Sequence, residues 1–181
     1  MADMTTRPRG GRLAEALARK RVPLGFLFGA AVVWLAHPSF RTLAIGGAVA
    51  AAGELVRIWA AGHLEKGSEV TRSGPYRLTR HPLYAGSALI GSGVAMASGR
   101  WSVAALVGAY LVVTILAAIR HEEANMRAAF GDGYDAYLSS RATPVDRVFS
   151  VERAWRNKEY RAIAGLIAVA AIFAFKASRH L

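Results

Sequence analysis

Five long apolar runs constrain the fold of this 181-residue chain more than any other feature. They lie at residues 22–36, 42–64, 83–99, 101–119 and 162–175. A helix that rises about 1.5 Å per residue needs about 20 such residues to cross the roughly 30 Å of hydrocarbon in a bilayer. Because backbone polar groups in lipid must be paired, these runs predict an all-α, polytopic integral membrane bundle of about five transmembrane helices.

Two of the runs make an antiparallel pair, and one is short. Only Arg100 separates 83–99 from 101–119, so these two helices are expected to form a hairpin. The run 162–175 makes only about 21 Å of helix. For that helix to span, Arg161 and Lys176 must extend their charged ends to the two interfaces.

The distribution of Lys and Arg predicts the orientation of the bundle. If the N-terminus is cytoplasmic, Arg57 lies inside a span, and only four of the 23 Lys and Arg residues fall on the far side: Arg41, Arg100, Lys176 and Arg179. Cytoplasmic segments of membrane proteins are enriched in Lys and Arg. We therefore expect a cytoplasmic N-terminus and active site, with the C-terminus on the opposite side.

The chain is short enough for a single membrane domain over residues 1–181. Its expected parts are a basic cytoplasmic segment at 1–21 with an interfacial helix at 12–21, two transmembrane helices within 22–64, a cytoplasmic linker at 65–81, the transmembrane hairpin at 82–119, a cytoplasmic segment at 120–160 and a last transmembrane helix at 161–177. Such an arrangement would place a cofactor pocket on the cytoplasmic side of the C-terminal half.

Charge and cysteine content remove several function classes. A net charge of +11 could suggest nucleic acid, but the basic residues lie between apolar runs, where they meet lipid head groups and set orientation. We therefore expect membrane lipids and no nucleic acid as partners. The chain has no cysteine, which excludes disulfides, thiolate metal sites and a cysteine nucleophile.

A helix start and two acidic residues are predicted to meet at the cytoplasmic face. Proline is favoured in the first helical turn, so Arg80-His81-Pro82-Leu83-Tyr84 marks the start of the hairpin. Such a start presents free amides that attract a carboxylate or phosphate. The far end of the hairpin returns Glu122 and Glu123 to the same level. Glu123 lies about 100° further round the helix than Glu122, so it is expected to point away from the site.

These motifs occur in a recognisable order. They are Gly74-Pro75-Tyr76, Arg80-His81-Pro82-Leu83-Tyr84-x-Gly86, Glu122-Glu123, Phe130-Gly131-x-x-Tyr134-x-x-Tyr137 and Thr143-Pro144. Over about residues 57–147 the chain resembles the isoprenylcysteine carboxyl methyltransferases and their phospholipid methyltransferase relatives. The resemblance implies S-adenosylmethionine as cofactor, in a site lined by His63, Glu69, Val70, Thr71, Tyr76, His81, Pro82, Leu83, Tyr84 and Glu122. Arg120 is the nearest match to the family's substrate-contacting arginine, although its spacing differs.

The residue types suit that cofactor. Arg80 and the helix start could bind its carboxylate, Glu122 its ammonium or ribose hydroxyls, and Tyr76 and Tyr84 its adenine or sulfonium. Neither a metal nor a covalent nucleophile is needed. Methyl transfer to an ionised carboxylate needs no base, whereas an amine acceptor would need one, for which His81 and Glu122 are the candidates.

The leading hypothesis is a membrane methyltransferase, most simply a carboxyl O-methyltransferase, whose lipophilic acceptor enters from the bilayer. There is no Gly-x-Gly-x-x-Gly loop after a predicted strand, which excludes a soluble Rossmann-type methyltransferase. Three alternatives stay open: a phospholipid or amine N-methyltransferase, a nicotinamide-dependent reductase of sterol-type substrates, and a non-enzymatic membrane scaffold.

Several residues have a structural interpretation as well. Glu54 and Arg57 are spaced i, i+3 within one span, where they could simply pair, or Arg57 could approach the cofactor site from below. Gly91 and Gly93 are expected to serve helix packing. Tyr134 and Tyr137 are expected to pack or to lie at the interface.

Overall fold

The computed structural model describes residues 25–139, 141, 143 and 145–179, and these residues contain helices and loops but no strand. The helices are Gly25–Leu35, α2 (Phe40–Ala61), the 3-10 helix η1 (Gly74–Arg77), α3 (Pro82–Ala97), α4 (Trp101–Phe130), α5 (Asp132–Leu138), α6 (Val151–Arg156) and α7 (Tyr160–Ser178). The expected interfacial helix at 12–21 lies outside the described residues.

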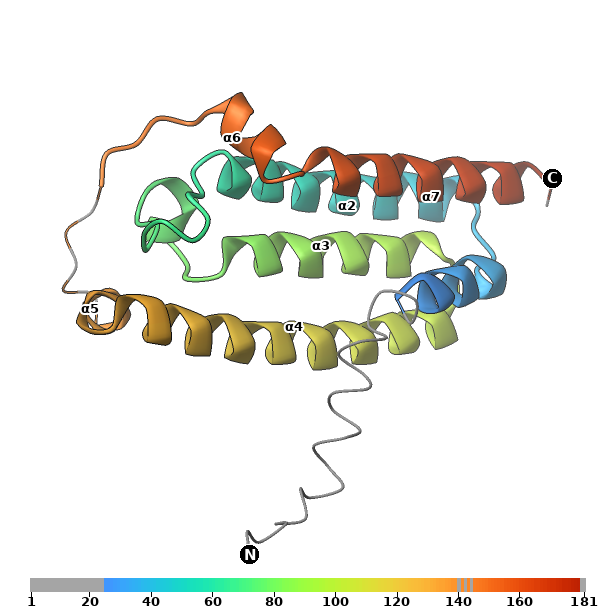
Figure 1. Ribbon diagram of the computed structural model, residues 1–181. Coiled ribbons are helices and arrows are strands. Elements are labelled where there is room, and N and C mark those ends of the chain that lie inside the picture. Colours follow the sequence, from blue (N-terminus) through green and yellow to red (C-terminus); the bar gives the residue numbers. More distant parts are fainter. Residues whose placement is uncertain (1–24, 140, 142, 144, 180–181) are drawn as a thin grey trace, which may run out of the picture.

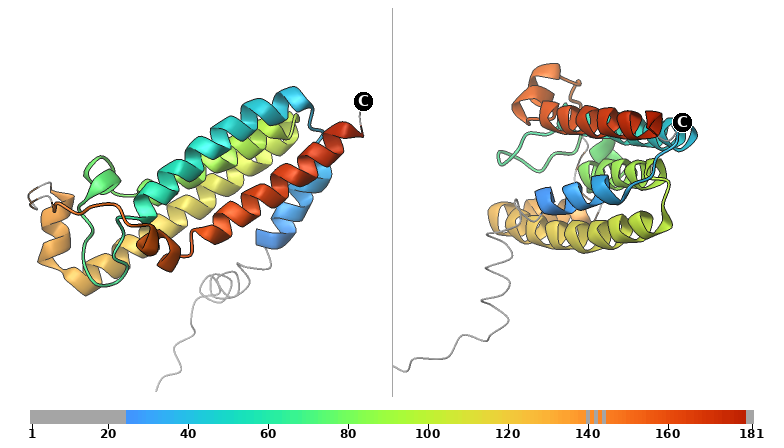
Figure 2. Two further views of the ribbon diagram at one scale, coloured as in Figure 1. Left: turned by 90° about the horizontal axis from the view of Figure 1, so that it is seen from above. Right: turned by 90° about the vertical axis from the view of Figure 1, so that its right-hand side faces the viewer.

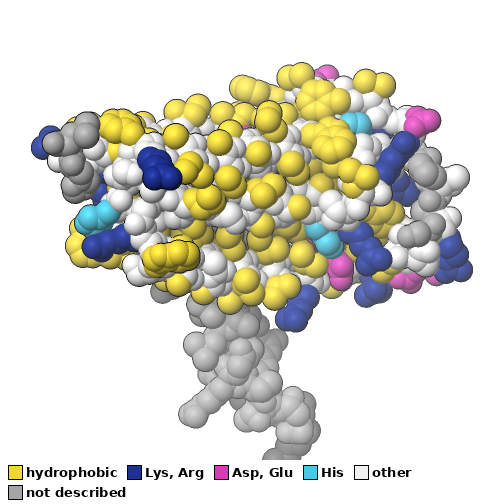
Figure 3. All heavy atoms as spheres, turned by 180° about the vertical axis from the view of Figure 1, so that it is seen from behind, with side chains coloured by type: hydrophobic (Ala, Val, Ile, Leu, Met, Phe, Trp, Pro, Cys, Tyr) yellow, Lys and Arg dark blue, Asp and Glu magenta, His cyan; other side chains and the backbone are white. Residues whose placement is uncertain are grey.

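The long helices run side by side (Figures 1 and 2). At one end of the bundle lie residues 62–81, α5 and α6, and we call this the linker end. The turns at His37-Pro38 and Ser98-Gly99 lie at the opposite end, together with the C-terminal end of α7 (Figure 1). Hydrophobic side chains cover the middle of the face drawn in Figure 3, and its acidic residues gather at the linker end.

The apolar runs all form helices, which confirms the predicted fold class. α2, α4 and α7 are long and apolar enough to cross a membrane, while Gly25–Leu35 and α3 are shorter apolar helices. α3 and α4 form the predicted hairpin. The orientation of the bundle stays a prediction.

The last helix is longer than its apolar run suggested. α7 has 19 residues, enough for about 28 Å of helix, because Arg161 and Lys176 are part of it. The Nζ atom of Lys176 donates to the carbonyl oxygens of Val33 and Trp34, at 2.8 and 3.0 Å. These carbonyls belong to the last turn of Gly25–Leu35, where a cation is favoured by the helix dipole.

Glycines bring α2 and α3 into direct backbone contact. A Cβ atom added at Gly53 would lie 2.7 Å from the carbonyl oxygen of Gly86, and one at Gly93 would lie 2.5 Å from the amide nitrogen of Ala50. Gly91 packs against the side chain of Leu111 on α4. The expected packing role of Gly91 and Gly93 is therefore confirmed, and small residues serve close approach here as they do in other membrane bundles.

α4 continues well beyond the hydrophobic segment, as predicted. It extends to Phe130 and ends at Gly131, whose φ of 45° is a conformation that glycine adopts without strain. The C-terminal end of α4 reaches the linker end (Figure 1), and its last turns contain Glu122 and Glu123.

The close α2–α3 contact predicts different effects for two adjacent glycines. A Cβ at Gly46 would overlap the Gly93 carbonyl oxygen and the Ala97 amide nitrogen, whereas a Cβ at Gly47 meets nothing within 4 Å. Both alanine substitutions gain the same helix propensity. Gly46→Ala should therefore be less stable than Gly47→Ala by about 1–3 kcal/mol, the usual cost of overpacking.

Thermal unfolding of the two purified variants in the same detergent measures this difference. Equal melting temperatures would show that α2 and α3 can move apart to accommodate the added methyl group without loss of stability. That result would contradict the close contact described above.

Candidate functional site

The residues predicted to form a cofactor site fall into two groups at the linker end. His63, Glu69, Val70 and Thr71 form the linker group. Tyr76, Arg80, His81, Pro82, Leu83, Tyr84 and Glu122 form the hairpin group, which lies around the start of α3 and the extension of α4.

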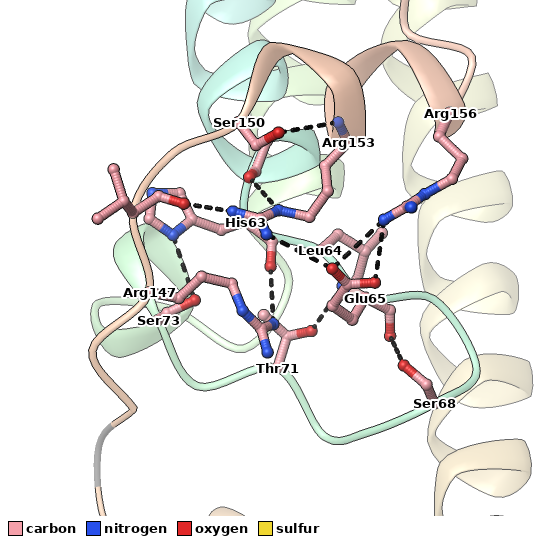
Figure 4. A network of polar contacts seen from close by, with 12 residues as sticks. His63, Leu64, Glu65, Ser68, Thr71, Ser73, Arg147, Ser150, Arg153 and Arg156 are labelled. Carbon is pink, nitrogen blue, oxygen red and sulfur yellow. Dashed lines mark hydrogen bonds and ion pairs between the residues drawn. The ribbon is translucent and has the colours of Figure 1, made fainter.

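The linker group is held by the segment that precedes α7 (Figure 4). Arg147 donates to both carboxylate oxygens of Glu69, at 2.6 and 3.0 Å. Thr71 is buried, and its hydroxyl accepts from the amide of Glu65 at 3.2 Å. Val70 is buried as well. These side chains have their partners within the protein, so they shape the linker more than they offer groups to a ligand.

The same segment completes the C-terminal end of α2. The last carbonyls of a helix have no partner within it and must find one elsewhere. Asn157 donates to the carbonyl oxygens of Ala61 and Leu64, both at 2.9 Å, and Arg153 donates to that of Gly62 at 2.8 Å. Arg153 and Arg156 also pair with Glu65, at 3.5 and 3.2 Å (Figure 4). The linker is thus attached both to α2 and to the C-terminal segment.

His63 is buried inside this network. Its Nδ1 atom lies 3.2 Å from the hydroxyl oxygen of Ser73, and its ring packs against Gly74, where a Cβ would lie 2.5 Å from the imidazole. Gly74 has a φ of 53°, so both space and backbone conformation favour glycine there. Burial lowers the pKa of His63 below its usual range, and the positive charges of Arg153, Arg147 and Arg77 add to that effect.

The hairpin group is arranged around the start of α3. Pro82 occupies the first turn of the helix and is buried, and His81 precedes it as the N-cap. The Nε2 atom of His81 lies 3.1 Å from a carboxylate oxygen of Glu123, and its ring lies 5.8 Å from that of Tyr84. The Nδ1 atom of His81 is buried and has no hydrogen-bond partner among the described residues.

The expectation that Glu123 points away from this group is wrong. Glu123 contacts His81 at the start of α3, and Glu122 is a hydrogen-bonding neighbour of Tyr84 in the first turn of the same helix. Both carboxylates therefore face the helix start, although they differ by about 100° around α4. Glu122 is exposed to solvent and Glu123 is partly covered.

Tyr76 of the hairpin group contacts one of the two tyrosines of α5. Tyr76 is buried, and its backbone carbonyl accepts from the hydroxyl of Tyr137 at 3.0 Å. Burial raises the pKa of Tyr76, and the negative charge of Glu122 raises it further. Tyr134 is buried beside Tyr137, in agreement with a packing role. Tyr76 thus stays protonated, and its backbone is fixed by the contact with Tyr137.

The two arginines of the predicted site differ in their surroundings. Arg80 is exposed and donates to the carbonyl oxygen of Leu138 at 2.8 Å, which joins the start of α3 to the end of α5. Arg120 is exposed on α4 and makes no hydrogen bond or ion pair with any described residue. Its role as a substrate contact stays a prediction.

Arg57 belongs to an ion cluster between three helices. Its Nε atom lies 2.6 Å from a carboxylate oxygen of Glu159, at the start of α7, and 3.9 Å from one of Glu54. Its Nη1 atom donates to the hydroxyl of Ser87 at 2.5 Å and to the carbonyl oxygen of Leu83 at 3.5 Å. The predicted Glu54–Arg57 pair therefore exists, but the closer partner of Arg57 comes from α7.

Glu159, Arg147 and Arg153 were not among the predicted site residues. Glu159 is buried at the end of a basic segment, and the two arginines were read only as charges that set the orientation. Their partners are about 80 to 100 residues away, as the 102-residue separation of Arg57 and Glu159 illustrates. The one local feature that could have indicated a role for Glu159 is its position, as an isolated acidic residue directly before an apolar helix.

Among the described residues, the hairpin group has exposed polar groups that could bind a ligand. These are the exposed carboxylate of Glu122 and the exposed guanidinium of Arg80, of which only the Nη2 atom is bonded to a described residue, Leu138. The Nδ1 atom of His81 is unpaired among the described residues but buried. Within the described residues, no three His, Asp or Glu side chains come together as a metal site.

A family model described as phospholipid methyltransferase matches residues 21–133. The matched residues contain the whole hairpin group and Glu123, and they end before Arg147, Glu159 and α7. No curated protein and no solved structure matches the chain.

The lowered pKa of His63 predicts that the linker end loosens in acid. The folded protein keeps His63 neutral, while an opened linker would bind a proton near the usual pKa of about 6.5. Protection of residues 62–81 from amide hydrogen exchange is therefore complete above that pH and falls below it, by at most about tenfold per pH unit for one proton.

Hydrogen exchange between pH 7.5 and 5.5, corrected for intrinsic rates, tests this expectation. His63→Gln should remove the pH dependence, and His121→Gln, at an exposed position, should retain it. The same pH dependence in the His63 variant would assign the effect to another group.

Proposed function

The chain belongs to the phospholipid methyltransferase family and is a multi-pass membrane methyltransferase, and we propose that it uses S-adenosylmethionine to methylate a carboxylate of a lipophilic acceptor from the bilayer. The observation that carries the proposal is the hairpin group. An exposed carboxylate, an unpaired histidine nitrogen and a fixed tyrosine lie together at one helix start, within the residues that match the family.

The hairpin group fits the cofactor by chemistry. The carboxylate of Glu122 would bind the ammonium or the ribose hydroxyls, since charge-assisted hydrogen bonds are the strongest available at such a site. The helix start and Arg80 would bind the carboxylate of the cofactor. Tyr84 lies beside Glu122 and offers an aromatic face to the sulfonium.

The linker group has a supporting role in this proposal. His63, Glu69, Val70 and Thr71 fix the backbone that precedes Tyr76, through the contacts of Glu69 with Arg147 and of His63 with Ser73. A fixed linker keeps the hairpin group in place and limits the access of water, which favours transfer of a cationic methyl group.

When bound, S-adenosylmethionine would supply a methyl group whose bond to sulfur breaks, with its electron pair, as the acceptor oxygen forms the new C–O bond. A carboxylate oxygen already carries the electron pair and charge for this step, so no residue of the chain has to remove a proton. The contribution of the protein is then alignment and exclusion of water.

A second candidate, methylation of an amine, is favoured by the contact of His81 with Glu123. A carboxylate that accepts from Nε2 would leave Nδ1 of His81 free to take a proton, and Nδ1 has no partner among the described residues. An amine must lose a proton to become a nucleophile, so this arrangement suits it. The family match names a methyltransferase and gives no support to the reductase and scaffold alternatives.

The stability of the product distinguishes the two acceptors. Membranes containing the protein are incubated with methyl-labelled S-adenosylmethionine, and the lipid extract is treated with mild base. We expect volatile labelled methanol, because base hydrolyses methyl esters. Label that stays non-volatile after base would identify amine methylation, because N–CH₃ bonds survive base, and the absence of label in the lipid or the protein would contradict both.

The role of Glu122 predicts a loss of affinity without a loss of stability. Glu122→Gln removes the charge and keeps the shape, so the affinity for S-adenosylhomocysteine should fall by about tenfold, the size of one charge-assisted hydrogen bond. Glu122 is exposed, so the melting temperature without ligand should not change.

Titration calorimetry of the purified protein measures this affinity. Glu152→Gln, an exposed carboxylate on α6, is the matched control and should bind as the wild type does. Unchanged affinity in Glu122→Gln would mean that another group binds the cation.

A further inference from the structure

A groove of about 340 Å³ lies between α3 and α7, beside α2. Its apolar walls are formed by Ile90 and Val94 of α3 and by Leu166 and Val169 of α7. Ligand sites in proteins have volumes of roughly 300–1,000 Å³ and combine apolar walls with a few polar groups. In both respects the groove resembles a site for part of a ligand.

The polar end of the groove is formed by Arg57 and Ser87. Nε and Nη1 of Arg57 are occupied by Glu159, Ser87 and Leu83, whereas its Nη2 atom makes no hydrogen bond with any described residue. The side chain is 22% exposed, so the guanidinium is accessible from the groove. An unpaired N–H group in an apolar environment raises the free energy, so a ligand oxygen that accepts from Nη2 would be favoured.

The charges around Arg57 select a neutral acceptor. The guanidinium already faces two carboxylates, Glu159 at 2.6 Å and Glu54 at 3.9 Å. A third anion would be repelled by them at short range. A carbonyl or hydroxyl oxygen accepts a hydrogen bond from Nη2 without adding charge.

The groove also points towards the hairpin group. The Nη1 atom of Arg57 contacts the carbonyl oxygen of Leu83, in the first turn of α3, and Ser87 lies one turn further along. The distance from Leu83 to Ser87 is about 6 Å along the helix. A chain in the groove would therefore have its polar end close to the helix start where we place the methyl donor.

We propose that this groove binds the hydrocarbon chain of the methyl acceptor, with a neutral carbonyl or hydroxyl oxygen of the acceptor bound to Arg57. The assignment of the occupant as the methyl acceptor rests on the proposed function. α7 lies beyond the residues that match the family, so this wall of the groove belongs to the part of the chain that the family model does not cover.

Two glycines in apolar helices provide a matched test. Gly165 lies on the α7 side of the groove, and Gly108 is exposed on α4 away from it. A Cβ at either glycine meets nothing within 4 Å, so a side chain can start at both positions without a clash with the backbone. Leucine at Gly165 extends into the groove, whereas leucine at Gly108 adds only to an exposed apolar surface.

The probe is a monoacylglycerol with a diazirine on its acyl chain, which has a neutral ester carbonyl and one hydrocarbon chain. Purified full-length protein in nanodiscs is photolabelled, and the labelled peptides are identified by mass spectrometry. We expect label on α3 and α7 around Val94 and Leu166. Gly165→Leu should lower this label about tenfold, and Gly108→Leu should leave it within about twofold of the wild type.

The head group is tested with an alkylammonium probe of the same chain length. It should label the groove more weakly than the monoacylglycerol. Stronger labelling by the ammonium would show that the carboxylates, not Arg57, face the occupant. Label spread evenly over the lipid-facing helices, or insensitive to Gly165→Leu, would identify ordinary bilayer lipid and overturn the proposal.

Titration of the same wild-type preparation with S-adenosylhomocysteine separates this proposal from the proposed function. Binding of S-adenosylhomocysteine without specific labelling would contradict the groove and leave the methyltransferase site standing. Specific labelling without binding of S-adenosylhomocysteine would leave a lipid site, but it would contradict the assignment of its occupant as a methyl acceptor.

Discussion

The backbone contact between α2 and α3 determines where the polar groups of this protein can lie. Gly53 and Gly86 let the two helices approach until a single Cβ would lie 2.7 Å from the opposite carbonyl oxygen. At Gly86 the missing side chain also leaves the space that Arg57 occupies, since a Cβ there would lie 2.5 Å from its Cγ atom. The guanidinium can then reach Ser87 and the first turn of α3. Helix packing and the position of the membrane-embedded charge therefore depend on the same glycines.

The segment before α7 stabilises the linker end because its side chains donate hydrogen bonds to carbonyl groups at the C-terminal end of α2. The last carbonyls of a helix have no partner within it, and here Asn157 donates to that of Ala61 and Arg153 to that of the C-cap residue Gly62. Asn157 also donates to the carbonyl of Leu64 in the linker. The same stretch contributes Arg147 to Glu69, so one segment both caps α2 and fixes the linker. His63 is enclosed between these contacts, and its neutral form is favoured by burial and by the surrounding guanidinium groups.

Much of this architecture could be predicted from local sequence, and the rest could not for a physical reason. Apolar runs predict the helices, and Pro82 predicts the start of one. Both are local signals, because each lies within the helix that it predicts. The partner of Arg57 was missed because Glu159 is 102 residues away, and no spacing rule reaches that far. Glu123 was misplaced because its direction depends on how the start of α3 sits against α4, which helical periodicity does not define. The roles proposed for the hairpin group stay predictions.

The division of the chain suggests how acceptor and donor recognition could change independently. The hairpin group lies within the matched residues, on α3, α4 and the linker. α7 forms one wall of the groove, and Glu159 at its start pairs with Arg57 in the ion cluster. A substitution at Gly165 or Leu166 alters the shape of the groove without touching the carboxylates of α4. A change at Glu159 would act differently, because it would leave the buried charge of Arg57 without its closest partner. Groove shape can therefore vary along α7, while Glu159 is constrained by the charge that it neutralises.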